Sequence, residues 1–207
     1  MAEQAIEPQA TPEAQAAIEP RATSAQIGVR FAIVAFLIAL DLWSKSAVFE
    51  WLQSRPPPEG MAYDTHGHHR YPIFGEWFGF MLSWNPGMAW GFDKLPTWLL
   101  VGGRCGAVAF LAWLVARSSP ARRAMTAALV LILSGAAGNL YDNLFMEPRR
   151  QGARFGEVRD FLDVYFTGFN WHFPTFNVAD ACITVGAVFL IGASFLAPKA
   201  HADAQRR

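Results

Sequence analysis

Four long apolar runs, separated by polar or aromatic-rich connections, dominate this 207-residue chain. They extend over about residues 27–43, 98–116, 124–141 and 178–197. Each run approaches the roughly 20 residues that an α-helix needs to cross a bilayer. The pattern therefore predicts an α-helical polytopic membrane protein with four transmembrane helices.

The connections between these runs differ in character. Residues 44–96 contain stretches in which aromatic residues and glycines alternate, for example over 73–80. This alternation is typical of short strands that lie at a membrane surface, with Trp and Phe as interfacial anchors. We therefore expect a small non-cytoplasmic β-rich element between spans 1 and 2. Residues 143–176 are expected to form a second non-cytoplasmic loop.

The two ends of the chain are polar. Residues 1–25 are rich in Ala, Glu, Gln and Pro, which predicts a disordered cytoplasmic tail. A four-span membrane domain is expected over residues 26–198, followed by a second cytoplasmic tail over 199–207. Lys and Arg gather near both termini and in the short loop 117–123, so this side is expected to be cytoplasmic. The opposite loop, 143–176, is also basic, which counts against this orientation.

Composition narrows the class of protein further. Hydrophobic residues make up 53% of the chain and charged residues 16%, whereas soluble domains are roughly 25% charged. The formal net charge is zero, so nothing indicates a nucleic-acid partner. Cys105 and Cys182 both lie in apolar runs, which favours two buried free thiols over a disulfide.

Polar residues from distant parts of the chain fall at the non-cytoplasmic ends of the predicted spans or just outside them. Charged groups at such positions are costly and usually mark functional sites. The members of this polar set are Asp41, Lys45, Asn85, Asn139, Asp142, Asp160, Asn177 and Asp180. Their convergence at one depth predicts a site at that face of the membrane.

Two pairs in this set share an Asn-x-x-Asp spacing. Asn177 and Asp180 open the last apolar run, where their side chains share one face of a helix. Helix capping is the alternative interpretation, because both residue types favour helix N-termini. Asn139 and Asp142 close the third run, where the alternative is a helix end that emerges among lipid headgroups.

The remaining members of the set suggest supporting roles. Asp41 and Lys45 are one helical turn apart, which predicts a structural ion pair. Asn85 begins an Asn-Pro-Gly turn, and it is a candidate for holding the backbone of a substrate.

Asp160 and Asp180 are the candidate catalytic pair. Two carboxyl groups held side by side share one proton, because both cannot ionise cheaply. The ionised member then activates water, and the protonated member polarises a scissile carbonyl. Asp142 is the alternative second carboxylate. We prefer Asp160, because a flexible outer loop can bring it over a substrate, whereas Asp142 is placed to hold a helix end.

Other catalytic chemistries find little support in the sequence. His66, His68 and His69 lie close together, but no carboxylate or cysteine has a matching ligand spacing, so a solvated loop is favoured over a metal site. Ser44 and Ser134 lie outside the patterns expected of a serine nucleophile. We therefore expect neither a metal nor another cofactor.

Taken together, the motifs resemble those of the bacterial lipoprotein signal peptidases (signal peptidase II). Five motifs occur in the family's order, and the resemblance covers residues 27–197. They are DLWSK at 41–45, NPGMAW at 85–90, GNLYD at 138–142, VRDF at 158–161 and FNVAD at 176–180.

The resemblance implies a membrane aspartyl endopeptidase of the bacterial inner membrane. Its substrate would be a diacylglyceryl-modified prolipoprotein, cut just before the lipidated cysteine. Asp160 and Asp180 would be catalytic, and Asp41 and Lys45 structural. The residues expected to bind the substrate or support the site are Asn85, Gly87, Asn139, Asp142, Asn177 and Ala179. We expect a monomer that contacts membrane lipids, with both termini cytoplasmic, the site near the non-cytoplasmic face, and inhibition by the cyclic peptide globomycin.

One position departs from the family pattern. Asn143 follows the aspartate of the GNLYD motif, where the family usually has Arg. The alternatives to an active peptidase are a non-catalytic lipoprotein-binding relative and a small proton-coupled transporter. Cleavage of a lipidated precursor distinguishes the three.

Overall fold

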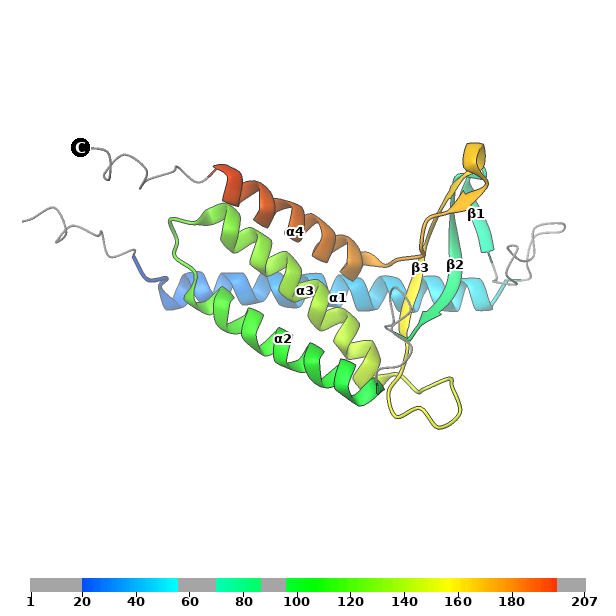
Figure 1. Ribbon diagram of the computed structural model, residues 1–207, viewed down its shortest axis with the longest axis horizontal. Coiled ribbons are helices and arrows are strands. Elements are labelled where there is room, and N and C mark those ends of the chain that lie inside the picture. The colour runs from blue at the N-terminus through cyan, green and yellow to red at the C-terminus, as the bar shows by residue number, and fades with distance from the viewer. Residues whose placement is uncertain (1–19, 56–69, 87–95, 197–207) are drawn as a thin grey trace, which may run out of the picture.

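The computed structural model describes residues 20–55, 70–86 and 96–196. Its helices are α1 (Ser24–Gln53), α2 (Thr97–Arg117), α3 (Arg123–Phe145) and α4 (Val178–Leu196). Its strands are β1 (Arg70–Phe74), β2 (Phe78–Asn85), β3 (Val158–Phe166) and β4 (Trp171–His172), with a 3-10 turn over Thr167–Phe169. Figure 1 shows the helices running side by side and the sheet standing across one end of the bundle.

The central helix is α3, which packs against α1, α2 and α4. A cluster of buried aliphatic side chains joins the first three helices. Its buried members are Val34, Val115, Leu129, Val130 and Leu133. Large apolar side chains elsewhere on the helices point away from the protein, including Phe36, Phe110 and Phe189. This outward apolar surface is what a lipid environment requires.

Three helices, α1, α2 and α3, are long and apolar enough to cross a membrane. The apolar stretch assigned to α4 is shorter, covering Val178–Ala193. The helices begin and end close to the predicted runs, although α1 continues ten residues beyond the expected end at 43. A capping box between Thr23 and Gln26 fixes the start of α1, so residues 24 and 25 of the expected tail are helical.

The sheet corrects one prediction. All neighbouring strands are antiparallel, in the order β1-β2-β3-β4. The connection between α1 and α2 supplies β1 and β2, but β3 and β4 come from the connection between α3 and α4. The β-rich element is therefore shared by two connections, and not confined to the first as expected. The pattern of the second connection differs from that of a buried strand because β3 carries three charged residues among its nine positions.

A close approach of α3 to α4 sets the geometry of the site end. A Cβ atom added at Gly135 would overlap the main-chain oxygen of Ala179, and one added at Gly138 would lie 2.6 Å from Asp41 Oδ2. Glycine is therefore required at both positions, as expected for helices that pack closely in a membrane. The cysteines are free; Cys182 is half-buried, but Cys105 is exposed, so the expected burial fails for Cys105.

Candidate active site

The ammonium group of Lys45 lies at the centre of the polar cluster. Its Nζ is 2.7 Å from Asp41 Oδ2 and 3.2 Å from Asp142 Oδ2, and it donates to Asn139 Oδ1 at 2.9 Å. The Lys45 side chain is fully buried, so the neighbouring carboxylates compensate its charge. Lys45 thereby links α1 to α3, in agreement with the predicted ion pair to Asp41.

Asp41 also holds the start of α4. Its Oδ1 accepts a hydrogen bond from the main-chain N–H of Ala179 at 2.9 Å. This N–H is among the first of the helix, which have no partner within the helix itself. The same carboxylate therefore neutralises Lys45 on one side and fixes the position of α4 on the other.

Asn177 and Asp180 cap α4 reciprocally. Asn177 Oδ1 accepts from the main-chain N–H of Asp180 at 2.8 Å, and Asp180 Oδ2 accepts from the main-chain N–H of Asn177 at 3.3 Å. Capping was the alternative interpretation of this pair, and the geometry confirms that both residues cap. Capping leaves Asp180 Oδ1 directed to Asn139, whose Nδ2 donates to it at 2.8 Å.

Asp160 lies in β3 and is almost completely buried, with 1% of its surface exposed. It stands opposite Ser83 of β2, just beyond a register shift between Phe80 and Ser83. Such irregularities often redirect a side chain next to an active site. The sequence-based expectation of a flexible outer loop is therefore wrong for this residue, because a strand holds it.

The segment before α4 brings Asp160 and Asn177 together. Phe176 pairs with Leu162 as a short antiparallel bridge, with hydrogen bonds in both directions at 2.8 and 3.1 Å. Asn177 Nδ2 then donates to Asp160 Oδ1 at 2.6 Å, and Asn85 Nδ2 donates to Asp160 Oδ2 at 3.0 Å. Both oxygens of Asp160 are thus oriented by amide groups from different elements.

Two amide side chains connect the two candidate catalytic carboxylates. Asn177 Nδ2 reaches Asp160 Oδ1 and also Asn139 Oδ1, at 3.0 Å, while Asn139 Nδ2 reaches Asp180 Oδ1. Asp180 is half-buried, whereas Asp160 is buried. The structure therefore brings together all of the predicted polar set, with one carboxyl group more open to water than the other.

Burial is the main reason that the pKa of Asp160 rises, to about 7. The negative charge of Asp180 raises it further, while the hydrogen bond from Asn85 and the charge of Lys45 act in the opposite direction. A substantial fraction of Asp160 is accordingly protonated near neutral pH, which is the state that a proton-donating carboxyl group needs.

Asp142, the rival candidate, has each of its oxygens occupied by cations or main-chain N–H. Arg159 donates to Oδ1 through Nη2 at 2.8 Å and through Nε at 3.3 Å, and its main-chain N–H donates to Oδ2 at 3.0 Å. Lys45 contacts Oδ2 as well. Asp142 thus anchors β3 to α3, one residue away from Asp160.

Two functional features escaped the sequence analysis. Arg104 of α2 donates from Nη1 to Asn143 Oδ1. Asn143 is the residue that stands where the family usually has Arg. Asp163 forms an ion pair with Arg70 at 2.5 Å, and its Oδ1 lies within hydrogen-bond distance of His172 Nδ1 at 2.9 Å; these contacts fasten β1 and β4 to β3. The lone arginine in the second apolar run was a visible signal, but the sequence did not indicate its partner.

Some expected participants cannot be placed. Gly87 and the histidines at 66, 68 and 69 lie outside the described residues. Within the described ranges, no three His, Cys, Asp or Glu side chains form a metal-binding group.

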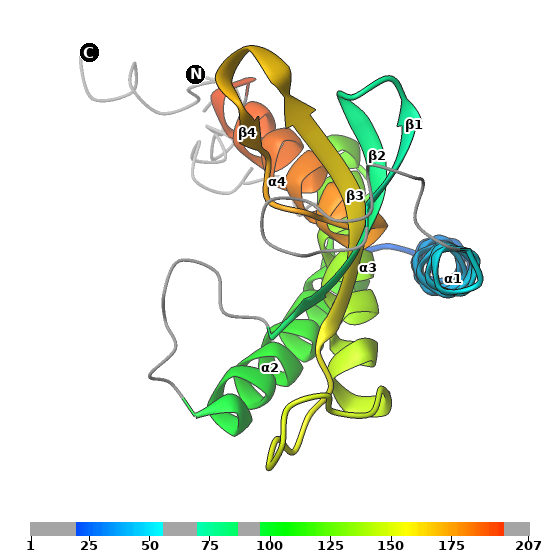
Figure 2. The same ribbon diagram turned by 90° about the vertical axis from the view of Figure 1, so that its right-hand side faces the viewer.

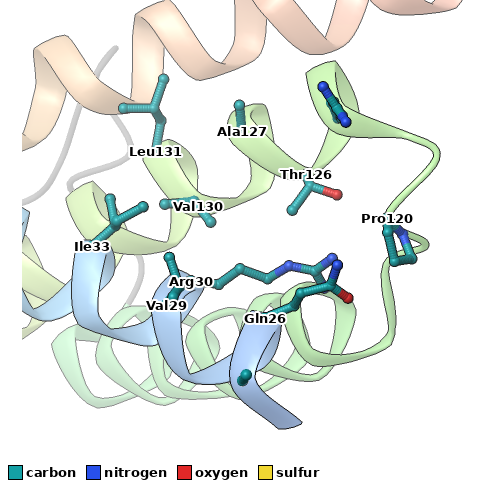
Figure 3. A pocket seen from close by; sticks show the side chains of 11 residues that line it. Gln26, Val29, Arg30, Ile33, Pro120, Thr126, Ala127, Val130 and Leu131 are labelled. Carbon is teal, nitrogen blue, oxygen red and sulfur yellow. The ribbon is translucent and has the colours of Figure 1, made fainter. Parts of the chain in front are cut away.

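A cavity of about 640 Å³ lies at the end of the bundle opposite the sheet (Figure 1). Figure 3 shows the side chains that line it. It lies between the start of α1 and the α2–α3 turn, beside Gln26, Arg30 and Pro120. There Arg30 Nη1 donates to the carbonyls of Val115 and Ser118, each at 2.9 Å. Arg30 thus ties α1 to the end of α2. None of the carboxylates discussed above is among the described residues that line the cavity.

The chain is similar to known proteins over most of its length. A sequence profile described as "Signal peptidase (SPase) II" matches residues 33–196. The lipoprotein signal peptidase of Yersinia pseudotuberculosis serotype O:1b (strain IP 31758) is 40% identical over 125 residues, which cover 58% of this chain and 68% of that protein. The lipoprotein signal peptidase of Yersinia pestis (strain Pestoides F) is 39% identical over the same shares.

Two solved structures, both described as a bacterial membrane enzyme, share the fold. One, determined at 1.9 Å resolution, gives a TM-score of 0.61 at 22% identity and covers 83% of this chain and 95% of its own. The other, at 2.3 Å resolution, gives 0.60 at 22% identity and covers 82% and 88%. The profile match extends over well more than half of the sequence, and the chain belongs to the signal peptidase II family.

Proposed function

We propose that this signal peptidase is an aspartic endopeptidase whose catalytic pair is Asp160 and Asp180. Its substrate is a diacylglyceryl-modified prolipoprotein, which it cuts before the lipidated cysteine. The observation that carries the proposal is the amide bridge from Asp160 through Asn177 and Asn139 to Asp180. The bridge holds two carboxyl groups from different elements at one end of the bundle.

The unequal surroundings of the two carboxyl groups favour different roles. Burial raises the pKa of Asp160 to about 7, so this carboxyl group holds the shared proton and donates it toward the scissile carbonyl oxygen. Asp180 is more open to water and acts as the base. It accepts a proton from a water molecule as the water oxygen attacks the carbonyl carbon.

The second step reverses these proton transfers. The tetrahedral intermediate is a gem-diol, and Asp180 passes the proton that it took from water to the leaving nitrogen. The C–N bond breaks, and a hydroxyl proton of the intermediate returns to Asp160 as the new carboxyl group forms. One water molecule is consumed, and the pair again shares one proton.

The placement of the sheet suits a substrate anchored in lipid. Large aromatic side chains are exposed on its two hairpins, and these belong to Phe74, Trp77, Phe166, Phe169, Trp171 and Phe173. Aromatic residues of this kind prefer the interface between headgroups and acyl chains. We infer that the sheet contacts membrane lipids where the diacylglyceryl group of a substrate would lie.

The arrangement in the membrane follows from the same proposal. With α4 as a fourth span, the domain 26–198 crosses the membrane four times and both termini are cytoplasmic. In Figure 1 the sheet lies at the end of the bundle opposite the start of α1 and the end of α4, and Figure 2 views this end directly. The polar cluster joins the sheet to the helices at this end. The active site then faces the non-cytoplasmic side, and one chain contains all the groups that the reaction needs, so a monomer suffices.

The deciding experiment is cleavage of a purified diacylglyceryl-modified prolipoprotein by the full chain in detergent. Wild type should release the signal peptide, and globomycin should block the reaction. D160N and D180N should retain the fold and lose most activity, because Asn cannot exchange the proton. Substantial cleavage by both single variants, at a rate near that of wild type, would contradict the proposal.

A further inference from the structure

Arg104 is a charged residue within α2, seven residues after the start of the helix at Thr97. Arginine in a membrane helix is costly, and it usually faces the bundle interior and a functional partner. Arg104 follows this pattern, since its side chain is partly buried and is directed to α3. Its immediate neighbours Gly102, Gly103 and Cys105 are exposed, so the arginine differs from the residues around it.

Asn143 holds the guanidinium of Arg104. Arg104 Nη1 donates to Asn143 Oδ1, and Asn143 is itself fixed by hydrogen bonds to Gly156. Asn143 Nδ2 donates to the Gly156 carbonyl at 2.8 Å, and the Gly156 N–H donates to the Asn143 carbonyl at 3.0 Å. Asn143 is buried, and only one residue separates Gly156 from the start of β3. The arginine is therefore attached to the segment that leads to Asp160.

Arg104 lies within electrostatic range of both members of the proposed catalytic pair. Its guanidinium interacts electrostatically with the carboxylates of both Asp180 and Asp160. Two other cations are close by. Lys45 also lowers the pKa of Asp160, but its charge is shared with Asp41 and Asp142, and Arg159 pairs with Asp142. Lys45 and Arg159 thus have carboxylate partners outside the pair, namely Asp41 and Asp142.

We propose that Arg104 is a positioning residue of the catalytic pair. Held in place by Asn143, its positive charge stabilises the state in which Asp160 and Asp180 together carry one negative charge. Asn143 stands where the family pattern usually has Arg, and here the asparagine accepts a hydrogen bond from Arg104 of the neighbouring helix. The inference rests on the proposed aspartic mechanism and adds a residue that the five motifs do not contain.

The test is the pH dependence of kcat/KM for cleavage of the lipidated precursor by wild type, R104K and R104Q. Loss of a nearby positive charge makes ionisation of the pair less favourable. The acidic limb of the R104Q profile should therefore move to higher pH by about half a unit or more, with kcat reduced about tenfold and KM little changed. R104K, which keeps the charge, should have an acidic limb close to that of wild type.

Two further variants separate positioning from a general effect on the fold. N143A keeps Arg104 but removes the side chain that holds its guanidinium. The acidic limb of the N143A profile should therefore move in the same direction as that of R104Q, but by less. The R104Q/N143A double variant should shift no further than R104Q alone, because the two residues act as a unit. R117Q removes an exposed arginine at the far end of the same helix and should leave the profile unchanged.

Each outcome has one meaning. A folded R104Q whose acidic limb matches wild type overturns the inference, even if kcat falls, and leaves the proposed function standing if D160N and D180N are inactive. Cleavage that persists in D160N and D180N overturns the proposed function and the inference with it. If R104Q does not fold, N143A decides alone, and an unshifted acidic limb in that variant overturns the inference.

Discussion

Asn177 donates a 2.6 Å hydrogen bond to Asp160 while the same residue caps the helix that carries Asp180. One side chain therefore contacts both β3 and α4. Its amide nitrogen donates to Asp160 in β3, and its amide oxygen accepts from the main-chain N–H of Asp180 in α4. These tasks can be separated by substitution, because a shorter hydroxyl side chain can cap a helix but has no amide to form the bridge.

We expect N177S to retain most of the stability and to lose most of the activity. Ser should still accept from the Asp180 N–H, but Asp160 would lose its closest donor. Turnover should fall by about two orders of magnitude, a loss comparable to that of one positioned polar group in a catalytic site. N177A should show the same loss of turnover and an additional loss of about 1 kcal/mol in the free energy of unfolding, because the cap is also absent. Thermal unfolding in detergent beside the cleavage assay checks both values. Equal stability of N177S and N177A would show that the cap contributes nothing.

Asp142 and Asp160 should respond differently to the same substitution. D142N removes a buried carboxylate that contacts Lys45 and Arg159, so two buried or half-buried cations lose a partner. Breaking such a pair costs about 3–5 kcal/mol, and D142N should therefore be strongly destabilised. D160N replaces a carboxyl group, a substantial fraction of which is protonated near neutral pH, by a neutral group of the same shape, and it should be stable but inactive. Unfolding midpoints and the specific activity of the folded fraction measure the contrast. A stable, inactive D142N beside an active D160N would reverse the two assignments.

The pH dependence of stability should carry the signature of Asp160. Its folded-state pKa of about 7 lies above the ordinary value of 3.8, so the folded protein binds the proton more tightly than the unfolded chain. The contribution of this tighter proton binding to the free energy of unfolding is fully present below pH 3.8 and is lost as the pH rises toward 7. D160N should be less sensitive to pH over this interval, which unfolding measurements between pH 4 and 8 would show. A slope that is identical in wild type and D160N would contradict the raised pKa.

Gly135 should not tolerate a methyl group. A Cβ atom there would overlap the main-chain oxygen of Ala179, which cannot move without displacing the first turn of α4. We expect G135A to separate α3 from α4, reduce stability and shift Asp180 from its partner Asn139. G103A is the matched control, because a Cβ atom at that helical glycine meets no atom within 4 Å. That variant should be neutral or stabilised by up to about 1 kcal/mol, since Ala is the better helix former. Similar activities for both variants would show that the close approach is dispensable.

The helices and most of the site were predictable from the sequence, for a physical reason. Apolar runs long enough to cross a bilayer leave few alternatives to a helix, and charged residues at one end of those runs are expensive unless they meet. This argument brought Asp41, Lys45, Asn139 and Asp180 together correctly. The close approach at Gly135 agrees with the same physical setting, because small residues allow helices to pack in a membrane.

The sheet was predicted less well, because β-strands depend on partners that lie far away in the sequence. β3 carries Arg159, Asp160 and Asp163 within nine residues, and charged residues are not favoured in strands by local propensity. In the fold, the charges of these residues are satisfied by Asp142, Asn177 and Arg70, which come from α3, the start of α4 and β1. The contact between Arg104 and Asn143 was likewise beyond a single sequence, because no local spacing connects residues on two different helices.

The division of the sheet between two connections sets an order for the maturation of the enzyme. Asp160 is held by Asn85 from the first connection and by Asn177 from the last part of the chain. The proposed catalytic pair is therefore incomplete while only the first three helices have been synthesised. On the proposed mechanism, a nascent chain hydrolyses no peptide bond until α4 is in place and the two connections have joined in one sheet.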